Sequence, residues 1–92
     1  MTAKTTLTEP IKVGEEWKNR RRNETVRITL STFEGVNICD IRQFFTDAEG
    51  KMRATKKGVA FNVRLLPTIA AALAKAEHKA RELGLIEPGA AQ

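Results

Sequence analysis

Basic and aromatic side chains alternate through one stretch of the sequence, residues 33–58. This stretch holds three of the four phenylalanines and five of the sixteen Lys and Arg residues. Guanidinium and ammonium groups bind phosphates and aromatic rings stack on nucleobases, so the mixture suits a surface that binds a nucleic-acid strand. The stretch contains no Ser or His and a single Cys, which suits it poorly to bond-breaking chemistry.

A second group of basic residues lies upstream of this stretch. Lys18 is followed by three consecutive arginines, Arg20, Arg21 and Arg22. Arginines are rarely buried without partners, so this run predicts an exposed edge strand or an arm, which Trp17 would anchor to the domain. The four basic residues are further candidate contacts to phosphates.

The positive charge of the chain is concentrated in its middle. The formal net charge is +5 at pH 7, and residues 17–65 carry eleven Lys and Arg against five Asp and Glu. A localised basic block is the electrostatic signature of a polyanionic partner.

The composition, 41% hydrophobic and 29% charged residues, is that of an ordinary folded domain. A domain of 92 residues buries only roughly 60–65% of its unfolded surface, so a second copy covering an apolar face would stabilise it.

Residues for catalysis or metal binding are scarce. His78 is the only histidine and Cys39 the only cysteine, so the sequence predicts no familiar metal site, intrachain disulfide or nucleophile–base pair. We expect Cys39 to pack as a small apolar side chain. The protein is therefore predicted not to be an enzyme and to need no cofactor.

Because it lacks a signal-peptide core and an apolar run of the ~20 residues that span a bilayer, we expect it in the cytoplasm, associated with the nucleoid.

The alternation of residues 25–32 predicts a half-buried strand. Three apolar residues at alternate positions, from Val26 to Leu30, share one face. Arg27 lies on the other face, where it is one more candidate contact to phosphate. Glu34-Gly35 then predicts a tight turn.

Three further segments complete the predicted sheet. Residues 36–45 predict a second strand, with a bulge or strong twist near its two phenylalanines. Residues 51–53 are extended and lead to a basic corner, and residues 59–63 close the sheet, with Phe61 on its core side. Because the gaps between strands are short, the sheet is predicted to be antiparallel.

The remainder of the chain predicts one helix. Apolar residues from Leu66 to Leu83 recur at spacings of three and four, with Asn62 able to cap the start, Pro67 in the first turn and Gly84 at a left-handed C-terminal cap. We expect this stripe to pack on one face of the sheet and a second flank of alanines to meet a partner helix. The predicted fold is therefore α+β: a four-stranded antiparallel sheet followed by one C-terminal helix, in a homodimer.

The domain boundaries follow from these elements. Residues 1–16 begin Thr-rich and show no periodicity, so they are predicted to form a flexible N-terminal tail. The domain itself spans residues 17–84. Residues 85–92 are predicted to form a C-terminal tail.

Three motifs at these spacings resemble a known family. Val26–Gly35 (VRITLSTFEG), Asp40-Ile41-Arg42 and Thr55–Val59 (TKKGV) are similar to the single-stranded-DNA-binding domain of the transcriptional coactivator positive cofactor 4 and its bacterial relatives. The resemblance extends from about Trp17 to Leu83. It implies a curved four-stranded sheet, subunits that pair through their helices, and binding of single strands or unpaired duplex regions without strong sequence preference, in a role in transcription.

The resemblance also implies roles for individual side chains. Phe33 and Phe45 would stack on bases, and Phe44 takes the place of the family's usual aromatic residue beside Phe45. The implied phosphate contacts are Arg42, Arg53 and Lys57, with Lys56 as the basic neighbour in the Lys-Gly corner.

Structural and functional alternatives remain open at this stage. Phe33 could pack in a core, Arg42 could form an ion pair with Asp40, and the two lysines before Gly58 could be solvated charges. The protein could instead be an adaptor that holds an acidic protein partner, which Glu34 would favour, or an RNA-binding module.

Overall fold

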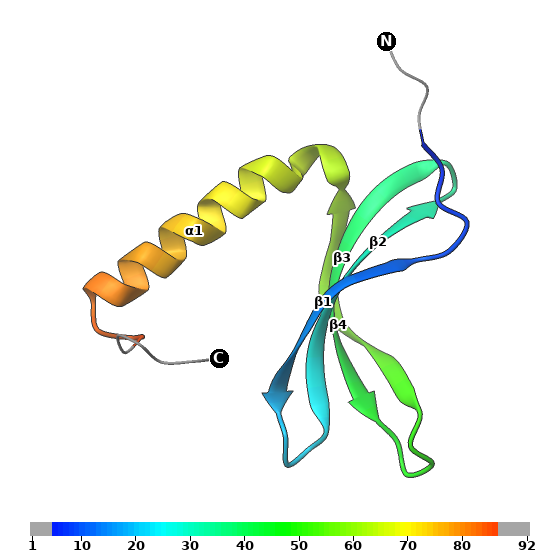
Figure 1. Cartoon of the computed structure of the whole chain (residues 1–92), viewed down its shortest axis with the longest axis horizontal. Coiled ribbons are helices and arrows are strands. Elements are labelled where there is room, and N and C mark those ends of the chain that lie inside the picture. Colours follow the sequence, from blue (N-terminus) through cyan, green and yellow to red (C-terminus); the bar gives the residue numbers. More distant parts are fainter. Residues whose placement is uncertain (1–4, 87–92) are drawn as a thin grey trace.

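A meander of four antiparallel strands leads into a C-terminal helix. The computed structural model describes residues 5–86. Each strand pairs with the next, in the order β1-β2-β3-β4 (Figure 1). This confirms the predicted order of four antiparallel strands and one helix. The elements are β1 (Ile11–Asn19), β2 (Glu24–Phe33), β3 (Val36–Thr46), β4 (Met52–Asn62), the 3-10 turn η1 (Val63–Leu65) and α1 (Leu66–Glu82).

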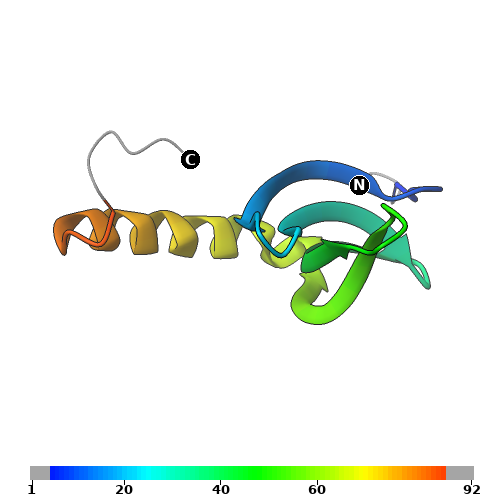
Figure 2. The ribbon, with the colours of Figure 1, turned by 90° about the horizontal axis from the view of Figure 1, so that it is seen from below.

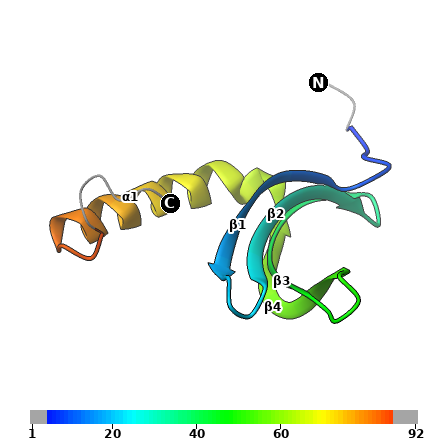
Figure 3. The same ribbon diagram turned by 60° about the horizontal axis from the view of Figure 1, so that its bottom comes forward.

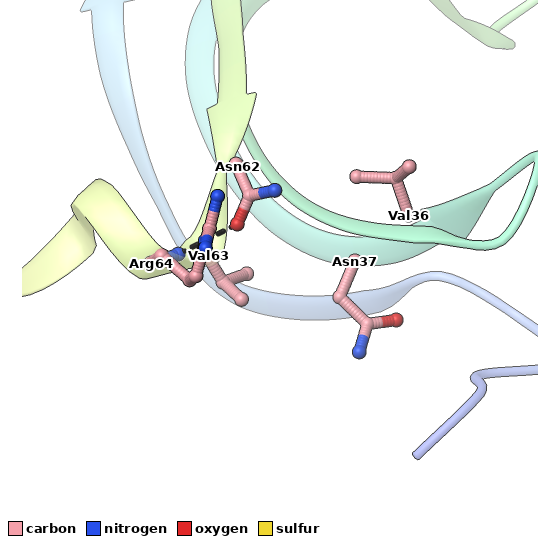
Figure 4. Close-up of a pocket in the computed structure, with 5 residues that line it drawn as sticks. All are labelled: Val36, Asn37, Asn62, Val63 and Arg64. Atoms are coloured by element: carbon pink, nitrogen blue, oxygen red, sulfur yellow. Dashed lines mark hydrogen bonds between the residues drawn. The ribbon is translucent and has the colours of Figure 1, made fainter. Parts of the chain in front are cut away.

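The sheet is strongly curved, so its two faces differ (Figures 2 and 3). Figure 4 shows Val36 pointing into the hollow of the curve and Asn37 pointing away from it. Because side chains alternate along a strand, Arg42 also faces the hollow, and so does Arg27, which pairs with it on β2. We call this side the concave face. The opposite, convex face carries the predicted apolar side chains of β2.

The convex face is apolar at its centre, and no helix or strand among residues 5–86 packs over it. Its centre is Cys39, the one apolar side chain that is fully buried among the described residues. Burial raises the pKa of the Cys39 thiol, in keeping with the predicted packing role. Phe61 pairs with Cys39 and is partly covered, whereas Val59, two residues before Phe61, is exposed.

The N-terminal boundary predicted from the sequence is wrong. β1 begins at Ile11 and pairs with β2, so residues 11–16 belong to the sheet and not to a tail. Residues before β1 also contact the sheet, because the Leu7 amide donates to Thr32 Oγ1 at 2.8 Å. Register shifts after Lys12 and after Trp17 interrupt the alternation of β1, which explains why no period of two is visible in its sequence. Residues 1–4 and 87–92 of the predicted tails lie outside the described part of the chain.

β4 is one continuous strand with an irregular centre, where the sequence analysis predicted two short segments and a corner. Its register with β3 shifts between Arg42 and Phe44, which places the predicted irregularity near the phenylalanines. Gly58 pairs with Arg42, and a Cβ atom on Gly58 would lie 2.6 Å from the Ile41 carbonyl oxygen. Only glycine allows β3 and β4 to approach this closely.

The turn between β2 and β3 has the predicted form. Phe33 pairs with Val36, which leaves Glu34 and Gly35 as a two-residue loop. Both loop residues have positive φ, 51° and 81°. This is the backbone of a type I′ hairpin turn, whose twist matches that of the flanking strands.

The predicted C-terminal cap of α1 is confirmed, whereas Asn62 caps the 3-10 turn η1 and not α1, whose own N-cap residue, Leu65, forms no side-chain cap. The Asn62 side chain accepts a hydrogen bond from the Arg64 amide at 2.9 Å, and the irregular first turn is η1. At the other end Gly84 has a φ of 78°, and the Leu85 amide donates to the Ala80 carbonyl at 2.8 Å. This is the Schellman arrangement that ends many helices.

The predicted packing of α1 on the sheet is wrong. The helix runs away from the sheet beyond η1 (Figures 1 and 2), and none of its residues is buried. Leu73, in the middle of the apolar stripe, is 58% exposed. The periodicity of the stripe reports that one side of the helix is apolar, but it carries no information on which surface covers that side.

Candidate nucleic-acid interface

Two arginines form the centre of the concave face. Arg27 on β2 and Arg42 on β3 are direct cross-strand partners. Arg27 donates from Nε and Nη2 to Glu15 Oε2, at 3.2 and 3.1 Å. Like charges directly opposite each other destabilise a sheet, so the carboxylate of Glu15 offsets this repulsion on the β1 side.

Arg42 is held more fully than Arg27. Its Nε and Nη2 donate to the two carboxylate oxygens of Asp40, at 3.0 and 2.8 Å, and its Nη1 donates to the Thr55 carbonyl at 3.0 Å. The hydrogen bonds to Asp40 raise the pKa of the Arg42 guanidinium. The ion pair that was the structural alternative for Arg42 is therefore present. A guanidinium has five N–H donors, so two remain for another ligand.

The carboxylate of Glu15 is a junction between β1 and β2. Burial acts to raise its pKa, but hydrogen bonds from Thr25, Lys12 and Arg27 outweigh burial, and the pKa of Glu15 lies below its usual value. Thr25 Oγ1 donates to Glu15 at 2.9 Å from a buried position. Glu15 therefore stays ionised and orients Arg27.

Phe44 completes this central group. It pairs with Thr25 across β2 and β3, and the Arg27 guanidinium lies 4.3 Å from the centre of its ring. This is a cation–π contact, in which the cation is attracted to the negative face of the ring. The structure thus brings together three of the predicted site residues, Arg27, Arg42 and Phe44.

The β1–β2 turn displays the arginine run. Lys18 pairs with Glu24 at 3.7 Å, and the Arg20 guanidinium lies 5.1 Å from the centre of the Trp17 ring system. The side chains of Arg21 and Arg22 are exposed and, within residues 5–86, form no ion pair. They are available to an anionic partner.

The β3–β4 hairpin holds the remaining predicted cations. Arg53 donates to Asp47 at 2.7 Å, and this hydrogen bond is the main reason that the pKa of Asp47 is lowered. Lys56 and Lys57, in the irregular part of β4, are exposed and have no ion pair with any described residue. This exposure is compatible with both the predicted phosphate contacts and the alternative of solvated charges.

The two phenylalanines predicted to stack on bases lie far apart. Phe33 is 64% exposed and stands at the end of β2, nine residue steps and roughly 30 Å of strand from Glu24 at the arginine end. Phe45 is 38% exposed. It follows Phe44 on an unbroken β2–β3 register, so it projects from the convex face. The predicted residues therefore occupy two ends and two faces of the sheet.

Two residues not predicted as contacts, Trp17 and Arg64, also line hollows of the sheet. Trp17, predicted to anchor the arm, pairs with Thr25 and therefore lies on the concave side, 47% exposed. Arg64, with Val36 and Asn62, lines a hollow of about 400 Å³ near the Phe33 end (Figure 4). The position of Trp17 on the concave face follows from its pairing with Thr25. The sequence could not predict this pairing, because the register shifts in β1 are not visible in it.

A sequence profile identifies the family of this chain. The sequence profile described as Transcriptional Coactivator p15 (PC4) matches residues 18–72, more than half of the chain. The chain belongs to the PC4 family. The PC4 family is a DNA-binding, non-enzymatic family. The match includes β2, β3 and β4 in full and ends within α1.

Solved structures of PC4 homologues share this fold. One from Burkholderia pseudomallei, in an orthorhombic crystal form, has a TM-score of 0.66 and 19% sequence identity, over 79% of this chain and 96% of that chain. The bacteriophage T5 homologue, implicated in recombination-dependent DNA replication, has a TM-score of 0.50 and 25% identity, over 83% of this chain and 94% of that chain. A comparison with curated proteins finds no match.

Two further findings concern the described residues alone. No helix in residues 5–86 is both long and apolar enough to cross a membrane. The same residues contain no group of three or more His, Cys, Asp or Glu side chains placed to hold a metal ion.

Proposed function

We propose that this PC4-family protein is a dimeric, cytoplasmic cofactor of transcription or DNA transactions that binds single-stranded DNA without strong sequence preference. The observation that carries the proposal is the concave face, where the cross-strand pair Arg27 and Arg42 lies beside the ring of Phe44. A curved basic surface with aromatic rings tracks a flexible phosphate backbone and stacks on bases of any identity.

Phosphates are contacted by two groups of cations in this proposal. Arg21, Arg22, Lys56 and Lys57 are exposed and form no ion pair within the described residues, so they bind phosphate without breaking an existing contact. Arg42 uses its two remaining N–H donors while Asp40 continues to orient it. The unpaired cations supply the larger share of affinity because a phosphate bound by Arg42 lies near a carboxylate.

Bases stack on the exposed phenylalanines. Phe33 is exposed beside a rigid two-residue turn, so its ring is presented with little loss of conformational freedom on binding. Phe45 projects from the convex face. A strand that reaches both rings must therefore pass around an edge of the sheet.

A second copy of the chain covers the apolar surfaces. The stripe on α1 is exposed at Leu73, and Val59 on the convex face is exposed as well. Such surfaces are typical of interfaces between subunits. Leu73→Lys should convert the dimer to a folded monomer in sedimentation velocity, whereas His78→Lys, exposed away from the stripe, should leave it dimeric. A monomeric parent protein would refute this part of the proposal.

The binding proposal is tested by fluorescence anisotropy of labelled oligo-dT at several salt concentrations. About six phosphate contacts predict a slope of log affinity against log salt near −4, since each contact to a single strand contributes roughly −0.7. Duplex DNA and RNA of matched length serve as competitors. The proposal would be contradicted if the protein did not bind oligo-dT, or if its affinity for oligo-dT did not change with salt concentration.

Glu34 favours one rival function. It is exposed beside Phe33 at the turn, where a carboxylate repels phosphate. An adaptor that binds an acidic protein through the cations elsewhere on the sheet would retain its partner after nuclease treatment. A partner released by nuclease would instead be bound through nucleic acid.

A further inference from the structure

The side chain of Trp17 borders a hollow on the concave side of the sheet. Trp17 pairs with Thr25, which in turn pairs with Phe44, so the two rings lie in one row on either side of a buried threonine. Neighbouring strands are about 4.8 Å apart, which puts the two rings roughly 10 Å apart. The hollow has a volume of about 350 Å³ and is lined by Glu15, Glu16, Trp17, Thr25 and Met52, a size within the range of ligand-binding pockets.

Each ring of this row has a guanidinium beside it. Arg27 lies over Phe44 at 4.3 Å, and Arg20 lies over Trp17 at 5.1 Å. The two contacts differ in exposure, because Phe44 is partly covered whereas Trp17 is 47% exposed. Indole is the largest aromatic side chain, and a half-exposed indole is the better platform for a stacked base.

The charge around Trp17 favours an anionic strand. Glu15 pairs with Arg27 and Lys12, and Glu24 pairs with Lys18. Among the described residues near the hollow, this leaves the carboxylate of Glu16 without an ion pair. This single negative charge is outnumbered by the three arginines of the β1–β2 turn, which form no ion pair within residues 5–86.

We propose that the hollow beside Trp17 is a slot for one base of the bound single strand, with Arg21 and Arg22 contacting the phosphates that flank it. This inference rests on the proposed function and extends it. The row from Phe44 to Trp17 gives the strand a path from the centre of the concave face to the β1–β2 turn. Met52 also lines the hollow, and its polarizable thioether can contact the edge of an aromatic ring.

Trp17 is also the natural probe of this slot. The sequence has one Trp and no Tyr, so intrinsic fluorescence reports on this site alone. Adding oligo-dT to the full chain should quench Trp17 fluorescence in a saturable way, with the same midpoint as the anisotropy of labelled oligo-dT. Trp17→Leu should weaken binding by about 5- to 150-fold, the range for removal of one stacked base, and Trp17→Phe should restore most of the loss.

The turn arginines are tested by salt dependence. Arg21→Ala/Arg22→Ala should reduce the magnitude of the log–log salt slope by about 1.4, as expected for two lost contacts to a single strand. The matched control, Lys75→Ala/Lys79→Ala, removes the same charge from exposed positions of α1 and should leave the slope unchanged.

The outcomes separate this slot from the proposed function. If oligo-dT binds with a steep salt dependence while Trp17 fluorescence stays constant and Trp17→Leu retains the parent affinity, the slot is refuted and the proposed function stands. If oligo-dT does not bind the parent protein at all, the proposed function fails and the slot fails with it. Thermal melts of the variants confirm that each is folded, as expected at a half-exposed edge position.

Discussion

Arg27 and Arg42 stand directly opposite each other on β2 and β3, and each guanidinium is held by a different carboxylate. Glu15 reaches Arg27 from β1, whereas Asp40 reaches Arg42 from two residues earlier on the same strand. Two cations can therefore share the centre of the concave face without the repulsion that unpaired neighbours would cause. The arrangement presents oriented donors at the centre, while Arg21, Arg22, Lys56 and Lys57 are exposed nearer the hairpin ends and form no ion pair within residues 5–86.

The first prediction concerns Arg42. Arg42→Ala should weaken oligo-dT binding by more than the loss of one charge, because it removes oriented donors as well. Its partly exposed pair with Asp40 contributes about 1 kcal/mol or less to stability, so the melting temperature should fall only slightly. Arg81→Ala, which breaks an exposed pair with Glu77 on α1, is the matched control. Equal binding by both variants would show that Arg42 serves the fold alone.

The second prediction concerns Phe33. Its ring is mostly exposed, so Phe33→Ala should change the free energy of unfolding by no more than about 0.5 kcal/mol. Affinity for oligo-dT should fall by roughly 5- to 150-fold if the ring stacks on a base. Phe61→Ala, on the convex face, should show the reverse pattern, with a lower melting temperature and little change in affinity once folded. A destabilised Phe33→Ala would assign that ring to packing.

The third prediction concerns Gly58. A Cβ at this position would meet the Ile41 carbonyl oxygen at 2.6 Å and the Arg42 Cα at 2.8 Å, so Gly58→Ala must push β3 and β4 apart. We expect a loss of about 1–3 kcal/mol in the free energy of unfolding by urea, as for other overpacked sites. Gly14→Ala is the control, since a Cβ there meets nothing within 4 Å. Equal stability of the two variants would contradict the close approach of the strands.

The fourth prediction concerns pH. Hydrogen bonds hold the pKa of Glu15 below its usual value of 4.5, so the folded state binds a proton less readily than the unfolded chain. The stability that Glu15 contributes is therefore complete above about pH 4.5 and is lost as pH falls through the lower folded-state pKa. Melting temperatures recorded across this acid range should decline less steeply for Glu15→Gln than for the parent protein.

The neighbouring residue provides the control for the pH prediction. Glu16 is exposed and, among the described residues, forms no ion pair, so Glu16→Gln should leave the acid decline of the parent protein intact. If Glu15→Gln and Glu16→Gln gave the same profile as the parent, the hydrogen bonds to Glu15 would not stabilise the folded state.

Features that depend on neighbouring residues were readable from the sequence. The alternation from Val26 to Leu30, the Glu34-Gly35 turn and the Gly84 cap appear in the structure as predicted, and Asn62 caps the 3-10 turn that leads into α1. Each of these features is determined within a few residues. The alternation of side chains determines the strand, the cost of positive φ determines the turn, and the need to pair free backbone groups determines the helix caps. The order of four strands and one helix was predicted from the same local patterns and is confirmed.

Features that depend on contacts between distant segments were decided by the tertiary structure alone. Only the register of β1 against β2 brings Glu15 to Arg27 and turns Trp17 toward the hollow. Only the register of β2 against β3 places Phe33 and Phe45 on opposite faces of the sheet, and only the direction of α1 leaves its stripe exposed. The physical reason is that strand pairing and helix direction are chosen by the summed energy of many long-range contacts, which no local pattern in the sequence records.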